Sequence, residues 1–236
     1  MSEPDIFGLA FRDYLSGETD GVIKVVTDLS EPEELPVGYF FRAVEQMPSW
    51  EQLVLDRCRG RVLDAGAGAG CHALALQDKG LEVVAIDRSE GAAEVMRQRG
   101  VKQAYMFDFF QFGEGGFDTI IFLMNGAGMA GTLGGLKKLL THAKRLLHRE
   151  GTIYLESTDL MYLYRQDDGS ALIPMGERYY GELHYRLGYK GHLAPPFPWL
   201  FVDPDNLDHI AGQCGMQTKI IFQGESYNYV AEMVLV

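Results

Sequence analysis

The chain has 236 residues, of which 47% are hydrophobic and 23% are charged, and its formal net charge is −12. This length fits one large α/β domain, and the lack of a long apolar run or a signal-peptide pattern predicts a cytoplasmic protein that does not span a membrane. The acidic balance without a Lys/Arg tract argues against nucleic acid and favours a small-molecule substrate, because phosphate contacts dominate nucleic-acid affinity. Three scattered cysteines lack the spacing of a zinc site, so we expect no bound metal.

The first 60 residues predict short elements. A weak helical pattern covers 5–15, a short strand covers 21–27, and the acidic, proline-containing segment 30–36 is typical of a loop. Ser49 with Gln52 predicts a capping box at the start of a helix that ends near residue 60. We treat 1–48 as an N-terminal extension.

From residue 61 onward, strand and helix patterns alternate. Predicted strands cover 61–65, 82–86, 103–107, 117–124 and 152–156, and predicted helices cover 71–79, 89–99 and 133–150, the last ended by Gly151. This alternation predicts right-handed βαβ units in a parallel, doubly wound sheet.

The periodicity changes after Ser157. Apolar and polar residues alternate through 179–189, as in a strand with one polar face, and prolines then interrupt the pattern. Asp203 and Pro204 predict the start of a helix, and 217–222 and 229–236 read as two terminal strands. We interpret 1–236 as a single domain with an antiparallel β insertion at 162–201.

A glycine-rich turn follows the strand at 61–65. In the segment 64–70, Asp-Ala-Gly-Ala-Gly-Ala-Gly, glycine recurs at every second position, which lets the backbone approach a ligand at the N-terminus of the next helix. A nucleotide-like ligand is expected here. The dinucleotide pattern G-x-G-x-x-G would place its third glycine at 71, where Cys71 stands, and Asp64 would repel a pyrophosphate but favour a cationic amino-acid group.

The second predicted strand ends at Asp87, whose carboxylate is placed to accept hydrogen bonds from ribose hydroxyls, with Arg88 beside it. An alternative role for Asp87 is helix capping. Asp108 follows the third strand and is placed to accept from an adenine amino group, while Phe109 and its neighbours either pack on the ring or belong to the core.

These motifs resemble those of class I S-adenosylmethionine (SAM)-dependent methyltransferases, in a bacterial branch of unassigned substrates. The resemblance covers 42–157 and includes the glycine turn, the acids at 87 and 108, and the strand that begins at Phe117. It implies SAM as cofactor, a Rossmann-like seven-stranded sheet of order 3-2-1-4-5-7-6 with the last strand antiparallel, and an insertion that caps the active site. The predicted cofactor-binding residues are Asp64, Ala65, Gly66, Gly68, Gly70, Asp87, Arg88, Asp108, Phe109, Met124, Asn125 and Arg42.

No motif identifies the methyl acceptor or the oligomeric state. The segment Met124-Asn125-Gly126 lacks the Asn/Asp-Pro-Pro-Tyr/Phe signature of enzymes that methylate base or glutamine amides. Candidates for a catalytic role are Asn125, Glu156, Tyr180 and His184, against the alternatives of turn, cap and core residues. Arg42 either contacts the methionine carboxylate or lies on the surface.

Two other functions share the same cofactor motif. A non-catalytic protein that binds SAM or its product would keep the glycine turn and Asp87. An NAD(P)-dependent oxidoreductase is disfavoured by the glycine spacing and by the lack of a Tyr-x-x-x-Lys pair.

Overall fold

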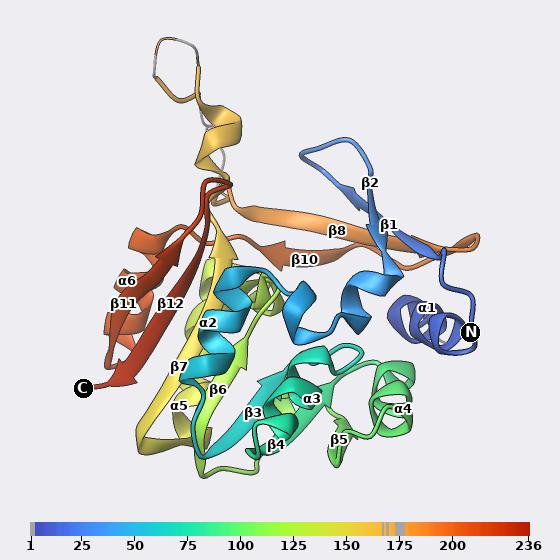
Figure 1. The fold of residues 1–236 in the computed structure, drawn as a ribbon. Helices are drawn as coiled ribbons and strands as arrows, with labels where there is room; N and C mark the ends of the chain where they lie inside the picture. Colours follow the sequence, from blue (N-terminus) through green and yellow to red (C-terminus); the bar gives the residue numbers. More distant parts are fainter. Residues whose placement is uncertain (1–2, 167, 169, 173–177) are drawn as a thin grey trace.

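A seven-stranded sheet forms the centre of the computed structural model, which describes residues 3–166, 168, 170–172 and 178–236. Its order is β11-β12-β7-β6-β3-β4-β5 (Figure 1). The strands are β3 (Arg61–Ala65), β4 (Glu82–Asp87), β5 (Gln103–Met106), β6 (Phe117–Phe122), β7 (Leu147–Thr158), β11 (Met216–Gln223) and β12 (Asn228–Leu235). Pairings from β5 to β7 are parallel, and β12 is antiparallel to both of its neighbours. The predicted Rossmann-like sheet and its strand order are confirmed.

Helices cover both faces of this sheet, as an α/β fold requires to bury its strands. The helices are α2 (Ser49–Arg57), α3 (Cys71–Asp78), α4 (Glu90–Gln98), α5 (Leu133–Leu146) and α6 (Pro204–Gln213). Apolar residues of α2, α3 and α4 form one core with the sheet, and those of α5 and α6 form the other. Within the described ranges, every helix is too short or too polar to cross a bilayer.

A second, antiparallel sheet lies across the carboxyl ends of the parallel strands (Figure 1). We call it the capping sheet; it contains β1 (Val22–Thr27), β2 (Glu33–Pro36), β8 (Glu182–Tyr189), β9 (His192–Leu193) and β10 (Phe197–Leu200). Its order is β10-β8-β1-β2, with β9 paired to β8. The cap is therefore built jointly by the N-terminal extension and the insertion.

The helix α1 (Ile6–Leu15) ties the extension to the parallel-sheet core. The Asp5 carboxylate accepts from Gly8 N at 2.9 Å, as the helix cap, and also from Ser89 Oγ at 2.8 Å and Gly91 N at 3.0 Å. A Cβ on Gly91 would lie 2.4 Å from Gly8 Cα, so α1 and α4 approach at van der Waals distance between backbones. One carboxylate thus caps α1 and joins it to the first turn of α4.

Three local predictions are corrected. Segment 30–36, expected to be a loop, contains β2, because β1 provides it with an antiparallel partner. Ser49 is not a cap: Pro48 precedes the first turn of α2, and the Gln52 amide donates to Met47 O at 2.7 Å. The fifth helix ends at Leu146 rather than Gly151, because β7 begins at Leu147 and pairs there with β6.

Candidate active site

The glycine turn joins β3 to α3 at the carboxyl edge of the parallel sheet. Gly66 and Gly68 have φ angles of +77° and +55°, a region that side chains with a Cβ rarely adopt. Asp87 at the end of β4 fixes the turn, because its carboxylate accepts from Gly68 N and from Ser89 N, each at 2.9 Å. The turn and the ribose-side acid are therefore parts of one hydrogen-bonded unit.

A cavity of about 630 Å³ separates this turn from the capping sheet. Its volume is within the range of about 300–1,000 Å³ that is usual for small-molecule sites. The wall on the side of the parallel sheet, which we call the lower wall, includes Asp64, Ala65, Gly66, Gly68, Asp87, Arg88, Asp108, Phe109, Met124 and Asn125. The opposite wall includes Val25, Glu33, Leu35, Tyr185, Leu187, Phe197 and Trp199, all from the capping sheet.

Several predicted residues lie elsewhere. Gly70 is behind the turn, where a Cβ would lie 2.9 Å from Met96 Cγ, and it does not line the cavity. Tyr180 is also outside the lining and donates its hydroxyl to Asp159 Oδ1 at 2.7 Å. His184 is exposed and contacts Asp28 on the far side of the capping sheet. The structure does not bring these two catalytic candidates to the site, because their side chains do not point into the cavity.

The end of β5 supplies the wall on the side predicted for adenine. The Asp108 carboxylate accepts from Phe110 N at 2.8 Å and remains exposed beside the cavity. Phe109 is only 3% exposed and packs edge to face on Phe122, so most of its ring belongs to the core. Phe107 and Phe110 are about 40% exposed, at 42% and 40%, and present more free ring surface to the cavity than Phe109.

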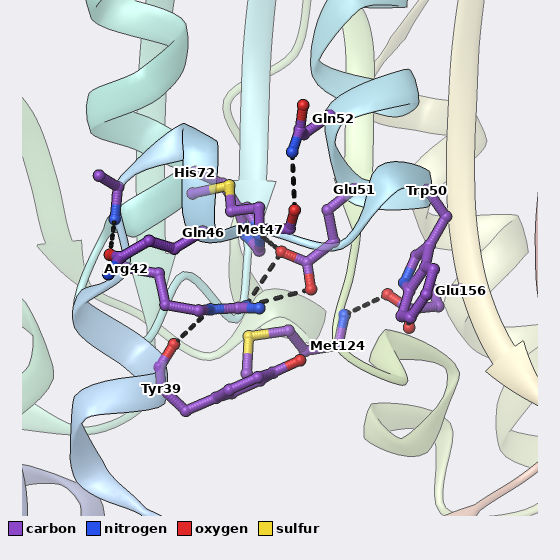
Figure 2. A network of polar contacts seen from close by, with 11 residues as sticks. Tyr39, Arg42, Gln46, Met47, Trp50, Glu51, Gln52, His72, Met124 and Glu156 are labelled. Carbon is purple, nitrogen blue, oxygen red and sulfur yellow. Dashed lines mark hydrogen bonds and ion pairs between the residues drawn. The ribbon is translucent and has the colours of Figure 1, made fainter.

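A buried ionic network, shown in Figure 2, adjoins the cavity, which its member His72 lines. Glu51 accepts from Arg42 Nη2 at 3.0 and 3.1 Å and contacts His72 Nε2 at 2.8 Å. Burial alone would raise the pKa of Glu51, but the His72 hydrogen bond and the charges of His72 and Arg42 outweigh it and lower this pKa. The Arg42 guanidinium also lies 3.5 Å from the centre of the Tyr39 ring, which does line the cavity. Arg42 itself is one layer behind the wall.

Glu156 lies near the carboxyl end of β7 and also lines the cavity. Its oxygens accept from Trp50 Nε1 at 3.1 Å and from Met124 N at 2.7 Å (Figure 2). Burial, together with the nearby charge of Glu51, raises the pKa of Glu156 to about 7. The adjacent Met124 and Asn125 both have φ of +55°, a strained conformation for residues with a side chain.

Two polar atoms on the cavity wall lack a hydrogen-bond partner among the described residues: Asp64 Oδ2 and Asn125 Oδ1. Burial raises the pKa of Asp64 to about 6. Buried polar groups are normally paired, so an unpaired carboxylate and an unpaired amide oxygen on one wall indicate a ligand with donors. The positive-φ glycine turn beside these acceptors lets a ligand approach the backbone closely.

The Rossmann-like sheet, the glycine turn linked to Asp87, and the capped cavity at the carboxyl edge fit the fold of the class I methyltransferases. A family described as "Methyltransferase domain" matches residues 62–151. A crystal structure of a SAM-dependent methyltransferase from Bacteroides fragilis, in complex with S-adenosyl-L-homocysteine, is 38% identical, covers 100% of this chain and 98% of its own, and has a TM-score of 0.91. The chain belongs to the SAM-dependent methyltransferases and uses SAM.

More distant structures share the fold. The CcbJ methyltransferase from Streptomyces caelestis is 18% identical over 82% of this chain and 94% of its own, with a TM-score of 0.60. CalS10, an amino pentose methyltransferase from Micromonospora echinaspora with bound SAM, is 14% identical over 88% of this chain and 100% of its own, also with a TM-score of 0.60. No curated protein matches the chain.

Proposed function

We propose that the protein transfers the methyl group of SAM to a small molecule held between the glycine-turn wall and the capping sheet. The observation that carries this proposal is the cavity of about 630 Å³, which has the cofactor motifs on one wall and an aromatic sheet face on the other. Methyl transfer needs little beyond a near-attack geometry, so a cavity that holds cofactor and acceptor between two walls supplies much of the catalysis.

The cofactor is assigned to the lower wall. Asp87 is proposed to bind the ribose, Asp64 the cationic amino group, and Asp108 the adenine, with Phe107 and Phe110 beside the ring. When bound, SAM supplies an electrophilic methyl group for in-line displacement. Arg42 is proposed to act through Tyr39 rather than by direct contact, because Arg42 does not line the cavity whereas the Tyr39 ring beneath its guanidinium does.

Asn125 and Glu156 remain the catalytic candidates of this proposal. The Oδ1 of Asn125 is buried without a hydrogen-bond partner among the described residues, while the amide nitrogen donates to Leu200 O at 3.3 Å, and we assign this oxygen to orient the acceptor. A carboxylate with a pKa of about 7 is suited to take a proton at neutral pH. The open cavity favours catalysis over the alternative of a non-catalytic SAM-binding protein, whose acceptor side would have no need of this space.

The test is a calorimetric titration of the full-length protein with S-adenosylhomocysteine, with NADH and NADPH as parallel ligands. Asp87→Ala is expected to weaken binding of the homocysteine nucleoside about 10- to 150-fold, the effect of losing hydrogen bonds to a charged group. Asp78→Ala, an exposed carboxylate at the end of α3, is the matched control and should bind normally. Unfolding curves of both variants identify any loss of the fold. Binding that persists in Asp87→Ala, or that is seen only with NADH or NADPH, would refute the proposed cofactor site.

A further inference from the structure

The inner face of the capping sheet can be assigned from its register. Residues directly opposite each other in antiparallel strands, and residues two apart along one strand, carry their side chains on the same face. Glu33 lies opposite Val25, and Val25 lies opposite Leu187. Tyr185 is two residues from Leu187 and lies opposite Phe197. These five residues therefore share one face, and all of them border the cavity.

Aromatic rings make up one part of this face. Tyr185 and Trp199 are stacked with ring centres 5.5 Å apart, and Phe197 meets Trp199 edge to face at 6.0 Å. Close packing fixes this arrangement, because a Cβ on Gly128 would lie 1.9 Å from the Trp199 ring. A rigid wall of π faces attracts a positively charged group as well as an apolar one.

Glu33 gives the same face a negative charge. In the described part of the chain no side-chain hydrogen bond or ion pair engages its carboxylate, and it is exposed to the cavity. Its charge adds to burial in raising the pKa of Tyr185, consistent with a position near that ring. The Glu33 carboxylate is therefore free to bind a group that enters beside the aromatic rings.

The balance of charged groups around the whole cavity also favours a positively charged ligand. The described lining residues include the carboxylates of Glu33, Glu34, Asp64, Asp87, Asp108 and Glu156. Against these, the basic groups of the described lining are Arg88, whose guanidinium lies 5.4 Å from the centre of the Phe197 ring, and His72, which contacts Glu51 behind the lining. Such a cavity repels an anionic acceptor and stabilises a cationic one.

We infer that the methyl acceptor is an amine that binds as an ammonium ion between the Glu33 carboxylate and the Tyr185–Phe197–Trp199 rings. This inference rests on the proposed methyl transfer. The bound ammonium first releases one proton to water or to Glu156. The nitrogen lone pair then forms the N–C bond while the C–S bond of SAM breaks with its electron pair going to sulfur. The product leaves as the methylated ammonium.

The test measures binding of benzylamine, benzyl alcohol and benzoate to the full-length protein saturated with S-adenosylhomocysteine. These three probes share a shape and differ in charge, and benzylamine is expected to bind most tightly and benzoate least. Glu33→Gln should weaken benzylamine about fivefold, the upper value for an exposed ion pair, and leave benzyl alcohol unchanged. Glu31→Gln, an exposed acid outside the cavity lining, is the matched control.

The aromatic wall is tested with a second pair of variants. Tyr185→Leu should weaken benzylamine about 2- to 30-fold, whereas Tyr185→Phe should retain its affinity because the ring remains. Equal affinities for amine and alcohol, no binding of the amine, or an unchanged amine affinity in Glu33→Gln would each overturn the inference. Saturation with S-adenosylhomocysteine is checked first, so failure of the cofactor site is distinguished from failure of the acceptor assignment.

Discussion

Replacement of Glu51 by alanine should destabilise the protein strongly. Glu51 is 1% exposed and Arg42 is 8% exposed, and their side chains are joined at 3.0 Å. Removing one partner of a buried pair leaves an uncompensated charge and costs about 3–5 kcal/mol. For a chain of this size, this free energy corresponds to a fall in melting temperature of roughly 6–20 °C.

Urea unfolding at neutral pH, with thermal unfolding in parallel, measures this loss. Glu94→Ala is the matched control, because Glu94 pairs with Arg12 at a similar 2.8 Å but both side chains are about 40% exposed, at 39% and 40%. An exposed pair contributes about 0–1 kcal/mol. If Glu51→Ala lost no more stability than Glu94→Ala, the argument from burial would be refuted.

The pH dependence gives an independent readout of the same network. The pKa of Glu51 is lowered from 4.5, so its contribution is present above that pH and is lost as pH falls through the lower folded value. Burial would lower the pKa of His72, but the Glu51 hydrogen bond and nearby acids raise it above 6.5. The His72 contribution is full below 6.5 and is lost as pH rises through the folded value. Glu51→Ala should therefore reduce the change in the free energy of unfolding both as pH falls below 4.5 and as pH rises above 6.5.

Three further predictions concern other contacts. Gly128→Ala should cost about 1–3 kcal/mol, because its Cβ would overlap Trp199; unchanged thermal unfolding would contradict this. Asp5→Ala should cost about 0.5–2 kcal/mol from the lost cap and increase hydrogen exchange in α1 and also around Gly91 in α4. Exchange that rises in α1 alone would argue against the link between the helices. Glu156 has a folded pKa raised from 4.5 to about 7, so it makes stability fall as pH rises between these values, and Glu156→Gln should lose that slope in urea titrations. A slope equal to that of the unmodified protein would show that another group causes it.

Local patterns were sufficient to predict the parallel sheet. Each βαβ unit carries its own signals, such as the strand at 61–65, the glycine turn and the Ser89 cap, whose side chain does accept from Ala92 N at 2.9 Å. The β3–β4 region also brings Asp64 and Asp87 to the cavity as the motif predicts. These features depend on residues close in sequence.

The capping sheet could not be predicted in this way. Val25 pairs with Leu187, and no local pattern relates two strands so far apart in sequence. The strand β2 is acidic and contains a proline, so it has strand character only through its pairing with β1. Glu51 was missed for a similar reason: in sequence it is an ordinary first-turn acid, and its partners Arg42 and His72 come from different elements.

The capping sheet combines strands from the N-terminal extension and from the insertion. This arrangement determines when the cavity can form during synthesis. Strand β1 leaves the ribosome early, but its partner β8 emerges about 158 residues later, since Thr27 pairs with Tyr185. At about 5–20 residues per second, this delay is roughly 8–32 s. The glycine turn and Asp87 are translated within that interval. The lower wall can therefore form on the nascent chain before the capping sheet exists. The side of the cavity formed by the capping sheet is completed only after β8 and β10 have been made.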